Sequence, residues 1–251
     1  MAALKETPGV VDASEVGSLR RMCDTVGDIT ILVAASDASS VFGALNDLSA
    51  VTHVTPVGAD ATELATTSGH AVLVRVTGPE SWGAALQQLT GSARHNDRLR
   101  TIAEQQGLEI SQEGVFRRPD GQRIPVPCEA GVYTLLRMST VPPEIREDLG
   151  EIELALAGQV PALIGPADIC GDLHSHTTVT DGRSMIEQNR TRAAELGYEY
   201  FACSGHAYPL RMVGGLDEHQ LEEQWARIDE LNAQPLPVLL SWLKRNRVPG
   251  R

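Results

Sequence analysis

One short run constrains the N-terminal half of this chain more than any other feature. Gly17 and Ser18 open the run, an arginine pair ending at Arg21 follows, and Asp28 precedes the apolar residues 29–33. Glycine lets the backbone approach a ligand closely, serine supplies a hydroxyl, and arginine supplies a cationic fork that matches phosphate oxygens. A carboxylate on the next strand is a ligand suited to Mg²⁺. The run therefore predicts an apolar strand beside a site for a triphosphate and a metal ion.

The predicted strand lacks one residue that such a site normally uses. Side chains two positions apart on a strand lie on the same face, so a second carboxylate is expected at position 30. Thr30 stands there instead. The sequence thus predicts a metal site with one acid, Asp28, on this strand.

Residues 17–33 resemble the palm motif of the DNA polymerase beta-like family X, in the bacterial version fused to a PHP (polymerase and histidinol phosphatase) domain. The family writes this motif as G-S-x-R-R-G followed by D-x-D. The resemblance implies a nucleotidyltransferase palm that binds a nucleoside triphosphate, with Asp28 as the catalytic ligand of Mg²⁺. The residues that match the motif are Gly17, Ser18, Arg21 and Asp28.

The chain departs from the family motif at three positions. Met22 replaces a glycine and Thr30 replaces the second acid. The family carries a third acid on a later palm strand, and Leu73 occupies that position. Two of the three palm carboxylates are therefore replaced, and we expect impaired or absent polymerase activity.

Residues 82–100 resemble a second segment of the same family. In the family, a helix, a Thr-Gly-Ser run and a downstream asparagine meet the incoming nucleotide. Gln88 and Leu89 replace the aromatic pair that usually precedes Thr-Gly-Ser. Residues 107–136 resemble the thumb. The nucleotide-binding residues implied here are Thr90, Gly91, Ser92 and Asn96.

The other informative run is residues 171–182, GDLHSHTTVTDG. His174 and His176 stand two positions apart on a predicted strand, so both imidazoles share a face and can bind one metal ion. Asp181 follows after a short loop and adds an oxygen ligand. Mixed nitrogen and oxygen ligands suit Mn²⁺, Zn²⁺ or Fe and the activation of a metal-bound water.

This run resembles the opening motif of PHP metallophosphoesterases, and residues 201–216 resemble the next motif. The family usually ends that motif in Thr-Asp-His, where this chain has Ser-Gly-His, with Gly205 in place of the acid. We expect residues 171–234 to form only the N-terminal part of the barrel, because a closed eight-stranded (β/α) barrel takes about 250 residues. The implied metal ligands are His174, His176, Asp181 and His206.

Strands and helices alternate along the chain, which predicts an α/β fold with an α+β palm built on a mixed sheet. We expect helices over 37–48, 79–89, 95–106, 129–138 and 150–157, and strands over 52–57, 61–66 and 71–76. The Gly165-Pro166 pair marks a linker. The expected divisions are a palm over 1–105, a small α/β thumb-like region over 106–164, the PHP segment over 171–234, with about two strands and two helices, and a divergent tail over 235–251.

Charge and composition limit the partners. The net charge of −12 argues against strong non-specific binding of nucleic acid, although two local clusters of arginines remain candidates. The chain has no 18-residue apolar run and no signal peptide pattern, so we expect a cytoplasmic protein without a membrane partner. The four cysteines are scattered without a CxxC, which indicates free thiols in a reducing compartment. The arginine clusters are Arg94, Arg98, Arg100 and Arg117, Arg118, Arg123.

Three functions remain open from the sequence. The first is a DNA repair polymerase of the family X type, with DNA and a nucleoside triphosphate as partners. The second is a metal-dependent phosphoesterase or exonuclease that works from the PHP motifs. The third is a non-catalytic remnant that binds nucleotide or DNA. We also expect self-association through the incomplete PHP segment, because exposed strand edges favour pairing with another chain.

Overall fold

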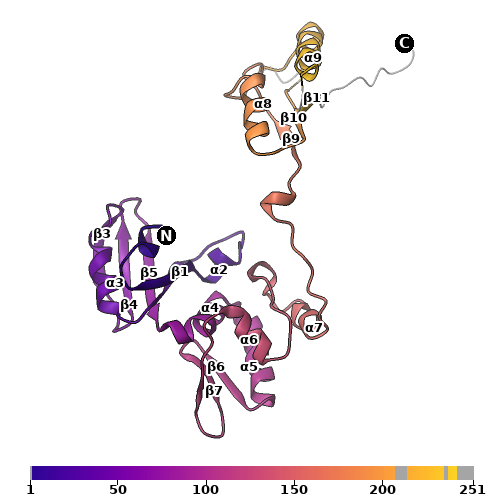
Figure 1. Ribbon diagram of the computed structural model, residues 1–251. Helices are drawn as coiled ribbons and strands as arrows, with labels where there is room; N and C mark the ends of the chain where they lie inside the picture. The colour runs from indigo at the N-terminus through magenta and orange to yellow at the C-terminus, as the bar shows by residue number, and fades with distance from the viewer. Residues whose placement is uncertain (1, 207–213, 235–236, 242–251) are drawn as a thin grey trace. The chain divides into compact units, whose positions relative to one another are not determined.

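The structure is a computed structural model that describes residues 2–206, 214–234 and 237–241. The chain divides into two compact units, Met1–Ala162 and Leu163–Arg251. Figure 1 shows the elements of both units in chain order. The helices and the mixed sheet confirm the predicted α/β class.

The first unit opens with a five-stranded sheet, whose strands lie in the order β1-β2-β5-β4-β3. β2 and β5 run parallel, and the other neighbouring strands run antiparallel. Four of the five strands were predicted, with bounds close to those expected, whereas the first strand was not. The strands are β1 Val10–Glu15, β2 Ile29–Ala35, β3 Val51–Pro56, β4 Ala61–Thr66 and β5 Ala71–Thr77.

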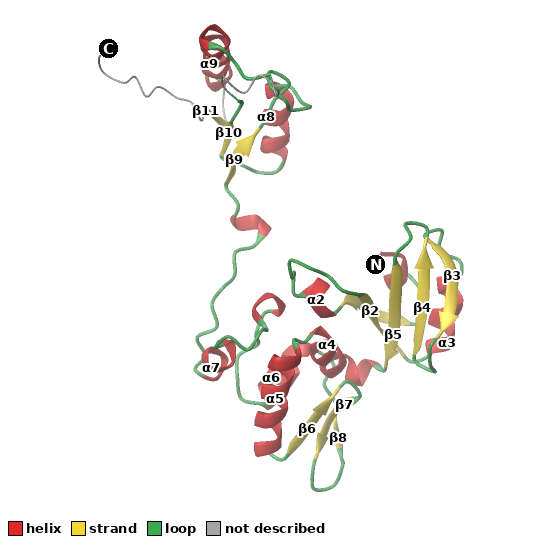
Figure 2. Cartoon of the chain, turned by 180° about the vertical axis from the view of Figure 1, so that it is seen from behind, coloured by secondary structure: helices red, strands yellow, loops and turns green. Residues whose placement is uncertain are grey.

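Each face of this sheet packs against a different cluster of buried residues, because successive side chains of a strand point to opposite faces. Val33 of β2 packs in a core that includes Val41 and Leu45 of helix α3 (Ala38–Leu45). Leu32, the residue before it, packs in a second cluster with residues of α4 (Trp82–Thr90). Figure 2 shows α3 beside the sheet and α4 at the start of the region that follows it. A short helix, α1 (Ala2–Lys5), precedes β1.

The region after the palm sheet has its own core. Its buried members come from four helices, a small antiparallel sheet and the loops between them. Leu99, Val115, Tyr133 and Ile152 are fully buried among them. The elements are η1 Pro79–Ser81, α4 Trp82–Thr90, α5 Ala93–Gln105, β6 Leu108–Ser111, β7 Gly114–Arg117, β8 Arg123–Ile124, α6 Glu129–Leu135, η2 Pro143–Ile145 and α7 Glu151–Leu156.

The core of the first unit changes before residue 105, where we expected the palm to end and the thumb-like region to begin. Ala84 of α4 and Leu99 of α5 belong to the same core as the β6-β7-β8 sheet. The two helices therefore pack with the thumb-like region, and the change of core comes near the start of α4. The sequence could not show this, because α4 contributes apolar side chains to both cores.

The second unit is a parallel sheet in the order β11-β10-β9. Phe201 and Cys203 of β10 pack with residues from both long helices, so α8 and α9 cover the same face. A short 3-10 turn, η3 (Pro166–Asp168), precedes the unit's first strand. The elements are β9 Gly171–Ser175, α8 Ile186–Glu195, β10 Tyr200–Cys203, α9 Glu218–Asn232 and β11 Val238–Ser241.

We expected about two strands in this unit, and the structure has a third within the segment 235–251 that we expected to be a divergent tail. Val238–Ser241 adds a third strand, parallel to β10. The rest of the expected tail, residues 235–236 and 242–251, lies outside the described residues. In the described part of the chain, no helix combines the length and the apolar character that crossing a membrane requires.

Candidate functional site

The first candidate site lies where β1 ends and the chain turns into α2 (Gly17–Arg20). Val16 anchors the turn, because it is buried and its N–H donates to the Thr30 carbonyl of β2 at 3.0 Å. Gly17 has φ 69°, a left-handed conformation that favours glycine over other residues. The Cys23 N–H donates to the Ser18 carbonyl at 3.1 Å and closes the turn. The predicted Gly-Ser segment thus forms a compact turn on β2.

Both arginines of this turn reach the thumb-like region. Arg20 makes two bonds of 2.8 Å to the carboxylate of Glu129 in α6, and its Nη1 also donates to Thr90 Oγ1 at 2.7 Å. Arg21 donates from Nε to Glu147 Oε1 at 2.7 Å and from Nη1 to the Thr90 carbonyl at 2.5 Å. The structure therefore brings the Gly17–Arg21 and Thr90–Ser92 segments together, as members of one predicted site.

The Thr90–Ser92 segment joins α4 to α5. Thr90 is the last residue of α4, and its Oγ1 donates to the Leu86 carbonyl of the same helix. Gly91 has φ 76°, and a Cβ added there would lie 3.1 Å from Arg21 Nη1. Ser92 begins α5, since its hydroxyl accepts the His95 N–H at 3.4 Å. The glycine thus permits the close approach of Arg21.

Asn96 is placed differently from the other predicted nucleotide ligands. Its Nδ2 donates to the Gln88 carbonyl at 2.6 Å, and its Oδ1 accepts from Gln87 Nε2 at 3.0 Å. Gln88, which stands where the family has an aromatic residue, accepts a bond from Arg100 at 2.8 Å. The amide of Asn96 is thus engaged within the protein, and its role toward a nucleotide stays a prediction.

Asp28 lies exposed just before β2, and the two replaced acid positions lie beside it. Thr30 pairs with Leu73 across the parallel strands β2 and β5. The Thr30 hydroxyl donates to Asp28 Oδ2 at 3.1 Å. Asp28 and Leu73 line a cavity of about 730 Å³, and Glu63 of β4, which pairs with Leu73, lines it too. Among the described residues, Asp28 belongs to no group of three potential metal ligands.

A buried polar network behind the turn was not foreseen from the sequence. Arg146, fully buried, pairs with Glu129 at 2.5 Å and donates to the Val141 carbonyl. Burial tends to raise the pKa of Glu129, but Arg20 and Arg146 outweigh it and hold the pKa below its usual value. Removing one member of such a buried cluster costs about 3–5 kcal/mol, because a charge is left unpaired.

The same network contains a buried histidine. His95 Nδ1 lies 2.7 Å from Glu151 Oε1, and its Nε2 lies 3.0 Å from the Tyr133 hydroxyl. Burial lowers the pKa of His95, and this outweighs the opposing effect of Glu151. The neutral imidazole therefore donates from Nδ1 to Glu151 and accepts at Nε2 from Tyr133. Burial would raise the pKa of Glu151, yet the bond from His95 and the backbone N–H groups at 148 and 149 hold it low.

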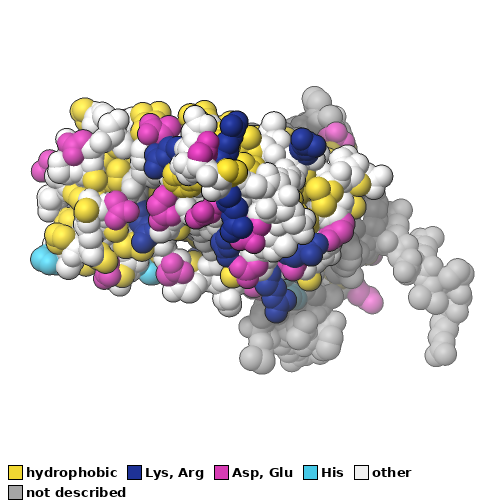
Figure 3. Space-filling view, turned by 90° about the horizontal axis from the view of Figure 1, so that it is seen from below, with side chains coloured by type: hydrophobic (Ala, Val, Ile, Leu, Met, Phe, Trp, Pro, Cys, Tyr) yellow, Lys and Arg dark blue, Asp and Glu magenta, His cyan; other side chains and the backbone are white. Residues whose placement is uncertain are grey.

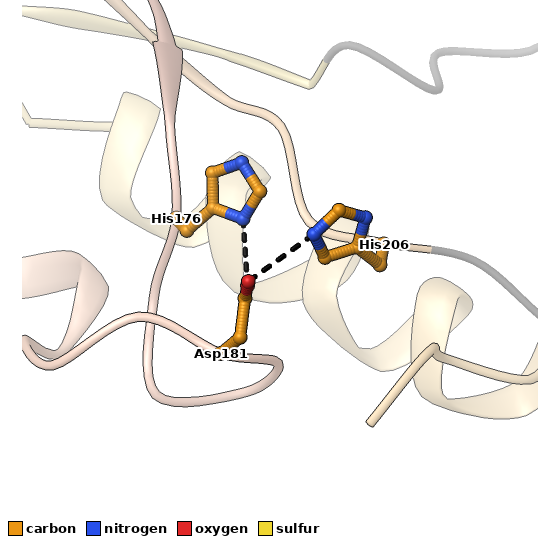
Figure 4. Close-up of side chains that lie close together, drawn as sticks. All are labelled: His176, Asp181 and His206. Carbon is orange, nitrogen blue, oxygen red and sulfur yellow. Dashed lines mark hydrogen bonds and ion pairs between the residues drawn. The ribbon is translucent and has the colours of Figure 1, made fainter. Parts of the chain in front are cut away.

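The second candidate site is a cluster of His176, Asp181 and His206 in the second unit (Figure 4). His176 follows β9 and His206 follows β10, and these strands are parallel neighbours, so both residues come to the same edge of the sheet. His176 Nδ1 lies 2.7 Å from Asp181 Oδ1, and His206 Nε2 lies 3.2 Å from Asp181 Oδ2. One ligand atom from each residue lies within 4.8 Å of the others.

The fourth predicted ligand, His174, stands at the margin of this cluster. Its Nε2 lies 3.0 Å from His176 Nε2, and the two rings stack with centroids 5.1 Å apart. His176 thus lies between His174 and Asp181. The bond from His176 lowers the pKa of Asp181 to about 2, so this carboxylate is ionised. Gly182 is required beside it, because an added Cβ would lie 2.4 Å from the backbone of His176.

Two comparisons with known proteins bear on these sites. Residues 85–147 match the family model described as DNA polymerase beta thumb. The match begins inside α4, which agrees with the boundary that the cores define. Over 233 residues, the chain is 31% identical to the DNA polymerase/3'-5' exonuclease PolX of Bacillus subtilis (strain 168). The alignment covers 92% of this chain and 40% of that relative's length. The chain is thus similar to a DNA polymerase beta thumb over residues 85–147 and to part of PolX over most of its own length.

Proposed function

We propose that the first unit binds a nucleoside triphosphate and DNA in the manner of a family X repair polymerase, and that its nucleotidyl transfer is weak or lost. The observation that carries the proposal is the meeting of Arg20 and Arg21 at Thr90. These residues belong to two segments about seventy positions apart that resemble nucleotide-binding motifs of one family. Guanidinium groups and exposed backbone N–H groups beside a glycine turn are suited to phosphate oxygens.

The donor set on the palm face explains why the chemistry is impaired. In-line phosphoryl transfer with two metal ions needs several anionic ligands to clamp the attacking and leaving oxygens. Of the three family acids only Asp28 is present, and it already accepts a hydrogen bond from the Thr30 hydroxyl. Glu63 lines the same cavity, but Leu73 lies between it and Thr30. Mg²⁺ sheds its water reluctantly, so one carboxylate holds it weakly without help from nucleotide phosphates. The residues present do not fit a two-metal centre.

Charge pairing in the thumb-like region points to weak binding of DNA. Arginines of both predicted clusters pair with carboxylates, as Arg98 does with Glu153 and Arg118 does with Glu104. On the face seen in Figure 3, arginine and lysine side chains are interspersed with acidic ones. Because DNA affinity grows with the number of phosphates neutralised, we expect weak and strongly salt-dependent binding.

Nucleotide binding and primer extension on a gapped duplex test this proposal together. We expect the chain to bind a nucleoside triphosphate with Mg²⁺ or Mn²⁺ and to extend the primer at a rate far below one per second. Arg21→Gln should weaken nucleotide binding, whereas Arg94→Gln, a matched change on α5, should not. Extension at rates typical of enzymes, about 1 s⁻¹ or more, would contradict the loss of chemistry.

We propose a second function, metal-dependent phosphoester hydrolysis, for the cluster of His176, Asp181 and His206. Two imidazoles and an ionised carboxylate within bonding reach of one point fit a single Mn²⁺, Zn²⁺ or Fe ion. Such an ion supplies a bound water that is a nucleophile near neutral pH. His174, stacked on His176, would orient that ligand or join it. The PolX relative is named as a 3'-5' exonuclease, and the hydrolysis of a phosphodiester that this name implies supports the proposal.

Metal analysis and a phosphoesterase assay separate this function from the first. We expect about one loosely held ion per chain and slow, Mn²⁺-stimulated cleavage of a model phosphodiester. His176→Asn and His206→Asn should abolish both, because each removes one ligand. His219→Asn provides the matched control, since His219 is an exposed histidine of the same unit and pairs only loosely with Glu223 at 3.6 Å. Full metal retention in the His176→Asn chain would exclude the cluster as the site.

We also propose that the second unit self-associates. β9 lies at the edge of the three-stranded sheet, and Leu173 on it is half exposed. An edge strand with an apolar side chain offers unpaired backbone groups to another chain. Sedimentation of the full chain should show dimers that Leu173→Lys weakens. Identical sedimentation of the two chains would count against pairing through β9.

A further inference from the structure

Glu147 forms an ion pair with Arg21, the cationic residue that the proposed nucleotide site would offer to phosphates. Its Oε1 accepts from Arg21 Nε at 2.7 Å, while Arg21 Nη1 donates to the Thr90 carbonyl at 2.5 Å. Two of the three guanidinium nitrogens therefore already have partners in the protein. The Glu147 side chain is 38% exposed and that of Arg21 is 14% exposed, so an incoming ligand meets the carboxylate more readily than the guanidinium.

The segment that carries Glu147 is fixed on both sides. Before it, the Arg146 carbonyl accepts the Ser92 N–H at 3.0 Å, and the Arg146 guanidinium is buried against Glu129. After it, the carboxylate of Glu151 accepts the backbone N–H groups of Asp148 and Leu149, each at 2.8 Å. Glu147 is thus presented to Arg21 by a backbone that is held in place from either side.

We propose that Glu147 is an internal competitor for the anionic ligand of Arg21, so that a polyphosphate binds by displacing the Glu147 carboxylate. This inference rests on the proposed nucleotide site and adds its regulation. Carboxylate and phosphate oxygens match the same guanidinium edge, so the two cannot both occupy Nε. The apparent affinity for a polyphosphate is therefore reduced by the fraction of molecules in which Glu147 holds Arg21.

Binding measurements on charge-neutralising variants test the competition. The probe is a fluorescent nucleoside triphosphate with Mg²⁺, and inorganic tripolyphosphate serves as a competitor that lacks a base and a sugar. Glu147→Gln keeps the shape of the side chain and removes its charge, so we expect binding about three- to tenfold tighter. Glu147→Asp, which keeps the charge and shortens the reach, should give a smaller gain.

Two controls make the result specific. Glu153→Gln is the matched control, because Glu153 pairs with Arg98 in the same unit and should leave affinity unchanged. In the Arg21→Gln background, Glu147→Gln should no longer tighten binding, since the shared partner is gone. Circular dichroism and urea unfolding of each variant establish that the fold is kept.

The outcomes separate this inference from the function on which it rests. Weaker binding in Arg21→Gln, with no gain in Glu147→Gln or Glu147→Asp, would overturn the competition and leave the nucleotide site in place. If Arg21→Gln leaves the affinity for the nucleoside triphosphate unchanged, the proposed site itself would be overturned. The absence of measurable binding in every variant, including Glu147→Gln, would overturn both.

Discussion

At the scale of single residues, Thr30 and Leu73 control which ligands the palm face can hold. Thr30 is 7% exposed, and its hydroxyl serves Asp28 as a hydrogen-bond donor. Leu73 lies between Thr30 on one neighbouring strand and Glu63 on the other. An acid at either position would stand beside an existing carboxylate, and like charges at that distance require a cation.

We therefore predict that the double change Thr30→Asp, Leu73→Asp makes the stability of the first unit depend on Mg²⁺. Without the ion, repulsion among the carboxylates should lower the melting temperature. Millimolar Mg²⁺ should restore it, because a ligand that binds the folded state stabilises that state. Differential scanning calorimetry with EDTA or Mg²⁺ measures the effect. The parent chain, which should respond little, is the control, and an equal response of both chains would count against this face as a metal site.

His95 provides a second prediction at this scale, which concerns pH. Burial lowers the pKa of His95, so the unfolded chain binds a proton below pH ~6.5 that the folded chain does not bind. Stability of the first unit should therefore be constant above pH ~7 and fall below pH ~6.5, by at most about 1.4 kcal/mol per pH unit. Glu129 and Glu151 have lowered pKa values, so their contributions are lost only at more acidic pH.

Urea unfolding between pH 5 and 8 measures this dependence. Trp82 is buried in the first unit and reports on it once Trp225 and Trp242 are replaced by phenylalanine. His95→Gln should remove the fall between pH 7 and 5.5, whereas His53→Gln, at an exposed palm histidine, should keep it. A slope that survives in His95→Gln would show that another group titrates.

At the scale of elements, α4 links the two cores of the first unit. One side of this helix packs on Leu32 of the palm sheet, and Ala84 packs in the core of the thumb-like region. The helix also approaches the 126–128 segment closely at Gly83, whose N–H donates to the Val126 carbonyl at 2.8 Å. A Cβ added at Gly83 would lie 2.2 Å from the Cys128 carbonyl oxygen. Only glycine fits this contact without a shift of the backbone.

We predict that Gly83→Ala destabilises the first unit by about 1–3 kcal/mol, as overpacking does when the neighbour is backbone. The matched control is Gly43→Ala in α3, where an added Cβ meets no atom within 4 Å. That change should stabilise by about 0.5–1 kcal/mol, because alanine is the better helix former. Urea midpoints of the two variants decide the matter, and effects of the same sign would contradict the close contact.

At the scale of the whole molecule, the chain consists of two units that each bury a core of their own. The residues that join them are almost all exposed, and Ile164 is 81% exposed. Exposed apolar residues in a segment without helix or strand are sites where a protease binds easily. Because few buried contacts hold this segment, its cleavage should leave both cores intact.

We predict that thermolysin, which cuts before large apolar residues, cleaves the native chain first at Leu163 or Ile164. The N-terminal fragment should keep the urea midpoint that Trp82 reports in the full chain. Replacing both residues by aspartate should slow the cut without changing that midpoint. A fragment that unfolds on release would show that the first unit depends on the second.

Much of the local structure could be predicted from the sequence. The strands of the palm sheet and the long helices follow from apolar periodicity and from breakers such as Gly107, which are local properties of the chain. The resemblance to PHP motifs named His176, Asp181 and His206 together, and the structure shows why they lie close: β9 and β10 are parallel neighbours that end at one edge of the sheet. The change of core near α4 could not be predicted, since this helix carries apolar side chains that pack in two cores.

The sequence by itself determined the α/β class, the elements and the residue types of both candidate sites. Only the tertiary structure decided the partners of the charged groups. Glu129 and Glu147 lie more than one hundred positions from the arginines that they bind, so no local pattern links them. Which charged side chains pair depends on which of them the packed fold brings close together. For this reason Arg21, predicted as a phosphate ligand, is found bound to a carboxylate.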